Sequence, residues 1–150
     1  MAFFGLFGKK QPVGEPRIIR ELKEFSKNAI TMVRDDLETA GSFLPFGGVL
    51  TTENHYEHVV YYDPELAKDA QAYAAKIQDV LKNKYQDPKC HMVMLVFDGI
   101  AHLPAGNSDA ISIRASHRPS NTHKMLLYPY KIVDGKLILQ DIENPHIIAA

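Results

Sequence analysis

The stretch Cys90-His-Met-Val-Met-Leu-Val-Phe-Asp-Gly-Ile-Ala-His-Leu103 is the most hydrophobic run in the chain. Consecutive side chains of a strand point to opposite faces, and here both faces are mostly apolar. One face would carry Cys90, Met92, Met94 and Val96, and the other His91, Val93, Leu95 and Phe97. Two apolar faces are typical of a central strand that is covered on both sides. The run is too short to cross a membrane, and polar residues at Asp98 and His102 interrupt it.

The chain has 150 residues, the size of one domain, and we divide it into three segments. Residues 1–16 are predicted to be a flexible apolar segment and linker, residues 17–142 a single α+β domain, and residues 143–150 a tail. With 17 basic and 18 acidic residues the formal net charge is -1, so general binding of polyanions is not expected, although a local basic patch remains open. The lone cysteine, Cys90, is interpreted as a core residue and suits a reducing cytoplasm.

The N-terminal segment carries Phe3, Phe4 and Phe7, and two lysines follow them. In a secretory signal the charges come first, so a signal peptide is not predicted. Two interpretations remain open. The phenylalanines could form an interaction segment for a protein partner, a membrane surface or a second copy of the chain, or the segment could be a flexible end. No transmembrane segment is predicted, and a homo-oligomer is left open.

Two amphipathic helices are predicted from the spacing of apolar residues. The first begins at Arg17 and ends before Gly41, a residue suited to the position after a helix. Its apolar stripe is Ile18, Leu22, Phe25, Ala29, Met32, Val33 and Leu37, and its opposite, solvated face includes Glu21. The sequence Asp63-Pro64-Glu65 predicts the start of a second helix that ends near Tyr85.

Strands are expected at 42–50, 56–62, 110–118, 123–132 and 136–142, between turn residues. Within the central run, Asp98-Gly99 could close a hairpin turn or form a bulge in one long strand. Residues 110–118 alternate, so that Ile111, Ile113 and Ala115 point one way and Ser112, Arg114, Ser116 and Arg118 the other. The predicted fold is α+β. An antiparallel sheet of five to six strands carries both helices on one face, in the order α-β-β-α-β-β-β with room for one more strand.

Catalytic and metal-binding motifs are missing from the chain. Neither a nucleophile elbow nor a phosphate-binding loop is present, and His55 and His58 have no CxxC or HExxH companion. We therefore predict no catalytic residue, no metal and no cofactor. His117 and His123 flank a turn and could lie close together across a hairpin, where a pair could bind a metal or an anion.

A local charge asymmetry is the best indication of a binding surface. No acidic residue occurs between Asp109 and Asp134, whereas Arg114 and Arg118 lie on one face of a predicted strand. Arginine and tyrosine are common in binding surfaces because they combine contact area with directional hydrogen bonds. The candidate binding residues are Arg114, Arg118, His117, His123, Tyr128 and Tyr130. An acidic protein partner, a nucleic acid, and a merely solvated sheet face are the three interpretations.

Three short motifs resemble a pattern in small bacterial α+β proteins, some of which are similar to immunity or accessory proteins of toxin systems. The motifs are Pro45-Phe46-Gly47, Asp109-Ala110-Ile111 with His117, and Pro129-Tyr130. The resemblance covers residues 40–142 and implies a bacterial, cytoplasmic binding protein.

We therefore predict a non-catalytic, immunity- or adaptor-like domain that binds a protein partner in the cytoplasm. One alternative is a small hydrolase or transferase that uses His117 or His123 with a nearby acid. The other is a protein that binds nucleic acid or another anion through the Arg114 and Arg118 face. A nucleic acid is a less favoured partner than a protein.

Overall fold

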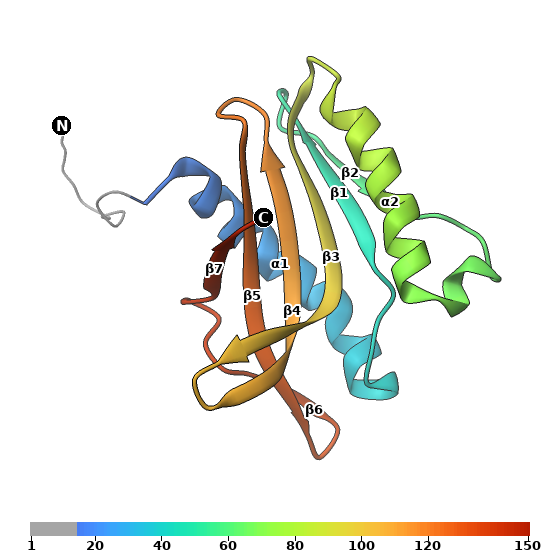
Figure 1. Cartoon of the computed structure of the whole chain (residues 1–150), viewed down its shortest axis with the longest axis vertical. Coiled ribbons are helices and arrows are strands. Elements are labelled where there is room, and N and C mark those ends of the chain that lie inside the picture. The colour runs from blue at the N-terminus through green and yellow to red at the C-terminus, as the bar shows by residue number, and fades with distance from the viewer. Residues whose placement is uncertain (1–14) are drawn as a thin grey trace.

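The computed structural model describes residues 15–150, so the phenylalanine segment lies outside the described residues. The chain begins with helix α1 and ends with strand β7 (Figure 1). The elements are α1 (Arg17–Ala40), β1 (Phe46–Thr51), β2 (Tyr56–Val59), the 3-10 turn η1 (Leu66–Lys68), α2 (Ala70–Tyr85), β3 (Cys90–Leu103), β4 (Gly106–His117), β5 (Thr122–Val133), β6 (Lys136–Leu139) and β7 (His146–Ala149). Neither helix of residues 15–150 combines the length and the apolar character needed to cross a membrane.

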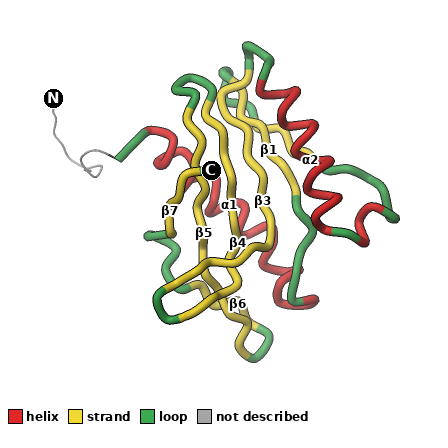
Figure 2. Tube along the Cα trace, in the orientation of Figure 1, coloured by secondary structure: helices red, strands yellow, loops and turns green. Residues whose placement is uncertain are grey.

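All strands belong to one antiparallel sheet in the order β2-β1-β3-β4-β5-β6, and β7 pairs with β5 (Figure 2). The α+β class and the antiparallel sheet are thus confirmed. β3 lies inside the sheet, as its two apolar faces predict. The sheet has one strand more than the upper predicted number, because β7 forms within the segment that was expected to be a tail.

The two helices lie on opposite faces of the sheet, so the prediction of both on one face is wrong. α1 packs on the face that carries Met92, Met94 and Val96, and it continues across β4 and β5. α2 packs on the other face, over Val93 and Leu95. In Figure 1 α1 passes behind β3, β4 and β5, while α2 runs beside β1 near the other edge of the sheet. The contacts of α2 with the sheet are to β3 and β1. The physical reason is that β3 is apolar on both faces, and each face needs its own cover.

A register shift at the start of β3 changes where two predicted side chains point. Leu50 pairs with Met92 but Thr51 pairs with Cys90, which leaves His91 as an extra residue. As a result Cys90 joins the core under α2, and His91 reaches Glu21 on α1. The predicted faces of Cys90 and His91 are therefore exchanged. Cys90 is buried, as expected, and burial raises the pKa of its thiol.

Asp98 and Gly99 lie within one continuous strand and form neither of the two predicted irregularities. The pairing of β3 with β4 runs without a shift from Met92 opposite His117 to Leu103 opposite Gly106. The chain reverses at residues 104–105, and β3 bends in its second half (Figure 1). A side chain at Gly99 would meet the Ser112 hydroxyl at 2.5 Å, so glycine is required by this close approach.

The second helix begins later than predicted. Asp63 accepts hydrogen bonds from the backbone N–H groups of Glu65 and Leu66, but the chain that follows forms only the short turn η1. Asp69 then caps α2 by accepting from the N–H groups of Gln71 and Ala72, both at 3.1 Å. Two aspartates with the same capping chemistry occur six residues apart, and the sequence pattern favoured the first one.

Asp98→Asn should stabilise the protein at neutral pH. Burial raises the pKa of Asp98, and this outweighs the hydrogen bond that its carboxylate accepts from the Tyr130 hydroxyl at 2.8 Å. A raised folded-state pKa means that ionisation costs folding stability above that pKa, and the cost vanishes as the pH falls toward the ordinary value of about 3.9. Thermal melts should show a higher Tm for the variant at pH 7 and no such gain near pH 3. An equal gain at both pH values would contradict this assignment.

Candidate functional site

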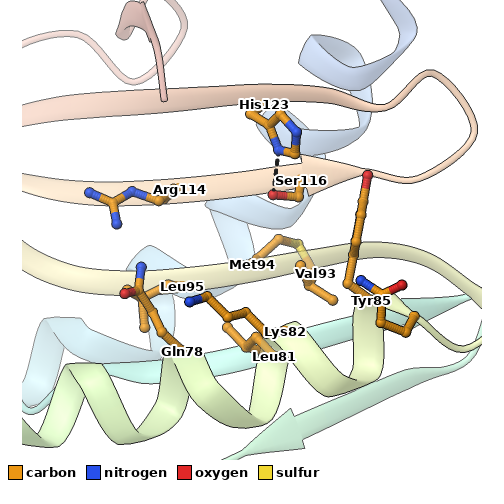
Figure 3. Close-up of a pocket in the computed structure, with 11 residues that line it drawn as sticks. Gln78, Leu81, Lys82, Tyr85, Val93, Met94, Leu95, Arg114, Ser116 and His123 are labelled. Carbon is orange, nitrogen blue, oxygen red and sulfur yellow. Dashed lines mark hydrogen bonds between the residues drawn. The ribbon is translucent and has the colours of Figure 1, made fainter.

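A groove between α2 and the exposed part of the sheet is the main candidate site (Figure 3). It has a volume of about 290 Å³. α2 packs over β1, β3 and the Val59 end of β2, and its core does not extend to β4 and β5, which lie open beside the helix. We call this cavity the α2–β4 groove. Its lining residues are Gln78, Leu81, Lys82, Tyr85, Gln86, Val93, Met94, Leu95, Arg114, Ser116 and His123.

The charge of the α2–β4 groove is entirely basic. Lys82 projects from α2 and Arg114 from β4, and the lining contains no aspartate or glutamate. Within residues 15–150 neither cation forms an ion pair. The cross-strand neighbours of Arg114 are Leu95 and Met125, so no acid stands beside it in the sheet. The Arg114 guanidinium carbon lies 5.7 Å from the centre of the Phe97 ring, a contact that steadies the side chain.

His123 and Ser116 form a hydrogen-bonded pair at the end of the α2–β4 groove, with His123 Nδ1 2.7 Å from Ser116 Oγ (Figure 3). A serine beside a histidine is the start of a nucleophile–base arrangement. However, no side-chain contact to a carboxylate orients His123 within the described residues. Ser116 also lies on a strand that is paired on both sides: its partners are Val93 on β3 and His123 on β5. The surrounding backbone N–H groups are therefore engaged in the sheet and do not form an oxyanion hole.

Arg118 has a structural partner, unlike Arg114. Its Nε donates a hydrogen bond to the carbonyl oxygen of Tyr85 at 3.0 Å, at the last residue of α2. A cation at this position is favourable because carbonyl groups at a helix C-terminus carry partial negative charge. Arg118 thus ties the β4–β5 hairpin to α2, and Arg114 with Lys82 forms the free basic pair.

Tyr128 and Tyr130 lie on one face of β5, as predicted, but that face packs against α1. The two residues are 1% and 5% exposed. Burial raises the pKa of Tyr128 to about 12, and the Tyr130 hydroxyl is bonded to Asp98. The two rings are core residues and lie on the opposite face of the sheet from Arg114.

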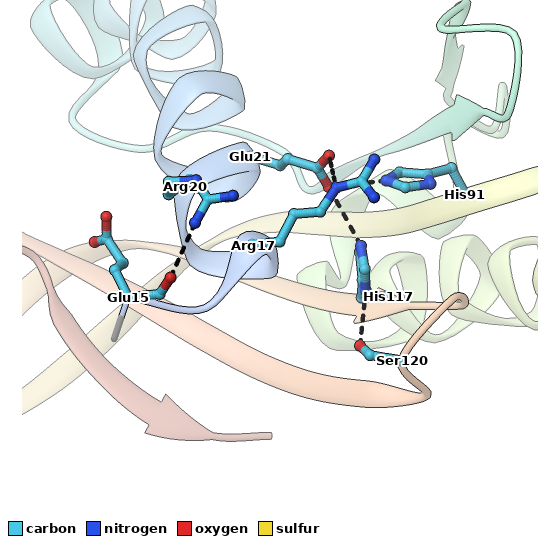
Figure 4. Close-up of polar contacts among 7 residues, drawn as sticks. All are labelled: Glu15, Arg17, Arg20, Glu21, His91, His117 and Ser120. Atoms are coloured by element: carbon cyan, nitrogen blue, oxygen red, sulfur yellow. Dashed lines mark hydrogen bonds and ion pairs between the residues drawn. The ribbon is translucent and has the colours of Figure 1, made fainter. Parts of the chain in front are cut away.

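His117 also points to the α1 face, so it does not pair with His123. It lies instead beside Glu21 of α1 and His91 of β3 (Figure 4). Glu21 Oε1 is 2.8 Å from His91 Nε2 and 3.3 Å from His117 Nε2, and the two imidazole centres are 4.8 Å apart. Arg17 Nε donates to the other carboxylate oxygen at 2.9 Å. We call Glu21, His91 and His117 the Glu–His–His cluster.

The protonation of the Glu–His–His cluster follows from its burial and its charges. Burial lowers the pKa of His117, and the neighbouring His91 lowers it further, so this imidazole is neutral at neutral pH. Burial alone would raise the pKa of Glu21, but hydrogen bonds with His91 and Arg17 outweigh that effect and lower it. His117 Nε2 is buried, and its contact with Glu21 Oε1 at 3.3 Å lacks the geometry of a hydrogen bond, so this atom makes none among the described residues. A buried polar atom without a partner costs about 1–3 kcal/mol, so this nitrogen calls for an explanation.

Sequence reasoning missed two members of this cluster. The sequence pattern places Glu21 on the solvated face of the first helix. It places His91 on the wrong face of β3, because the register shift cannot be read from composition. One signal was present: the alternation of β4 places His117 on the same side as Ile111, Ile113 and Ala115. A histidine on a core face needs a polar partner, and that requirement points toward a cluster.

Comparison of the chain with protein-family models, with curated proteins and with solved structures finds no match. The function is therefore argued from the two sites themselves.

Proposed function

We propose that the protein is a non-catalytic binding domain that holds an acidic, partly apolar segment of a protein partner in the α2–β4 groove. The observation that carries this proposal is the basic pair Lys82 and Arg114, which face an acid-free groove without an ion-pair partner in residues 15–150.

The two cations differ in what they offer a ligand. Arg114 presents a planar fork that matches a carboxylate in a bidentate geometry, whereas Lys82 is a point charge on a flexible stem. Between them, Leu81, Val93 and Leu95 provide an apolar floor. An acidic side chain flanked by an apolar one would satisfy both parts of the groove. Charge complementarity of this kind favours specificity and fast association.

A nucleic acid is a poorer fit to the same groove. Single-stranded nucleic acids are usually held by aromatic rings that stack on the bases, in addition to cations that contact phosphates. Tyr128 and Tyr130, the rings predicted for this role, are buried on the opposite face. Tyr85 does line the groove, but it is a single ring whose hydroxyl is held by Asn121 at 2.9 Å. A hydrolase is also less well supported, because among residues 15–150 the Ser116–His123 pair has neither an orienting acid nor an oxyanion hole.

The test uses a random peptide display library selected against the full chain. Wild-type protein should enrich peptides that combine Asp or Glu with a large apolar residue. A synthetic peptide from that selection should bind about tenfold or more weakly to the Lys82→Glu/Arg114→Glu variant, because like charges then face each other. Its affinity should also fall as salt is added, since the pair is at the surface.

A matched control has the same change in net charge at other sites. Lys27→Glu/Lys131→Glu alters two exposed lysines on α1 and at the end of β5, and it should bind the peptide like wild type. Enrichment without any preference for acids, or equal binding by both double variants, would refute the proposal. Binding of single-stranded DNA that is lost in the groove variant and falls steeply with salt would replace the peptide with a nucleic acid.

A cytoplasmic location belongs to the same proposal. The lone thiol of Cys90 is buried in the core under α2, and unpaired thiols are the rule in reducing compartments.

A further inference from the structure

The Glu–His–His cluster joins three elements that are far apart in the sequence (Figure 4). Glu21 comes from the second turn of α1, His91 from the irregular start of β3, and His117 from the last position of β4. The hydrogen bond from the Arg118 N–H to the His91 carbonyl, at 2.9 Å, fixes the two strand ends beside each other. The cluster is thus held on paired backbone and a helix, which position side chains more precisely than loops do.

We propose that Glu21, His91 and His117 bind a divalent transition metal ion of the Zn²⁺ class. This site is on the α1 face of the sheet, so it is separate from the α2–β4 groove.

The distances between the three groups suit a common ion. Two nitrogen or oxygen ligands that each lie about 2.0–2.1 Å from a tetrahedral zinc are about 3.3–3.4 Å apart. Glu21 Oε1 is 3.3 Å from His117 Nε2 and 2.8 Å from His91 Nε2. All three ligand atoms lie within 4.8 Å of one another. Small side-chain rotations would bring the shortest distance to the required separation.

The hydrogen bonding of His117 points to a ligand at its second nitrogen. Its Nδ1 is 2.7 Å from the Ser120 hydroxyl, so Nδ1 can donate its hydrogen there. Nε2 is then left with a free lone pair, and it is buried with no hydrogen bond in the described residues, because Glu21 Oε1 at 3.3 Å does not meet hydrogen-bond geometry. The side chain of His117 is only 4% exposed. A metal-bound histidine usually donates its other ring N–H to an acceptor in this way, which fixes the tautomer that the metal needs.

The ligand types indicate which ions the cluster would accept. Imidazole nitrogens suit zinc, copper, nickel, cobalt and iron, whereas magnesium and calcium prefer sites made of oxygen atoms alone. Three protein ligands leave a fourth position for water or another small ligand. Glu21 also lines a pocket together with Glu24, Phe25 and Asn28, which gives solvent access to the carboxylate. The positive charge of Arg17 disfavours binding of a metal cation, because its guanidinium already contacts the second oxygen of Glu21.

The experiment is titration of the untagged full chain with Zn²⁺ by calorimetry, and with Co²⁺ by its visible absorption. We expect one ion per chain. Glu21→Gln and His91→Asn should each weaken binding by about 100-fold or more, and Ser120→Ala, which removes only the acceptor for His117, by about 10–100-fold.

Two further variants separate a loss of metal binding from a loss of fold. Arg17→Gln removes the competing cation from an exposed position, so it should bind Zn²⁺ several-fold more tightly than wild type, a gain that misfolding cannot produce. His123→Asn removes a solvent-exposed histidine and should leave the affinity unchanged. No binding of either ion by wild type, or equal binding by wild type, Glu21→Gln and Ser120→Ala, would overturn the proposal.

Discussion

Replacing Leu22 by alanine should lower the free energy of unfolding by about 2–5 kcal/mol. Leu22 is completely buried where α1 meets the sheet, in the same core as Met92, Met94 and Ile113. The substitution removes the transfer free energy of the buried atoms and leaves a cavity that the strands can only partly fill. Urea unfolding followed by circular dichroism would measure the change. A loss below about 1 kcal/mol would contradict the position of α1 on this face.

Met32→Ala is the matched control on the same helix. The predicted apolar stripe includes Met32 together with Leu22, but Met32 is 44% exposed in the structure. Methionine and alanine are both good helix formers, so the substitution should change the free energy of unfolding by less than about 1 kcal/mol. A loss as large as that of Leu22→Ala would mean that another surface covers Met32 in solution.

The elements of this fold could be predicted, but the side of the sheet on which each helix lies could not. The stripe of α1 and the alternation of β4 depend on local spacing. The alternation is confirmed, and so is the stripe except for Met32, which is exposed. An apolar stripe shows that a helix is buried without showing which of two apolar faces receives it. The prediction that β3 is covered on both faces already requires one helix on each face. The prediction of both helices on one face is inconsistent with it.

Among the candidate site residues, Arg114 and His123 line the α2–β4 groove together with Lys82. The sequence predicts the first two as binding residues, but it does not predict that Lys82 lies beside them. Lys82 comes from α2, and its approach to β4 depends on packing that has no signature in the sequence. Arg118 was indistinguishable from Arg114 by strand alternation, yet it lies beyond the end of β4 and bonds to α2. Tertiary contacts thus separated a structural arginine from one that is free to bind.

Gly99→Ala should destabilise the protein by about 1–3 kcal/mol, the usual cost of forcing extra atoms into a packed interior. The added Cβ would lie 2.5 Å from Ser112 Oγ and 3.1 Å from a carbon of the Phe97 ring. Ser112 is fully buried and its hydroxyl donates to the Ala110 carbonyl, so it has little room to move. Gly48→Ala is the control: the atoms nearest its new Cβ belong to the half-exposed Tyr56 ring, which can swing outward.

The double variant Gly99→Ala/Ser112→Ala decides whether this clash is the cause. If it is, deleting the Ser112 hydroxyl removes the closest contact, and the double variant should be more stable than the sum of the single effects by about 0.5–3 kcal/mol. The rescue should be partial, because Ser112 Cβ at 3.3 Å and the Phe97 ring remain. If the changes in the free energy of unfolding are strictly additive, the cost of Gly99→Ala comes from the bend of β3 and not from the close approach of Gly99 to β4. In either case the bend is what brings the second half of β3 over Ala110 and Leu127, where a third small core forms.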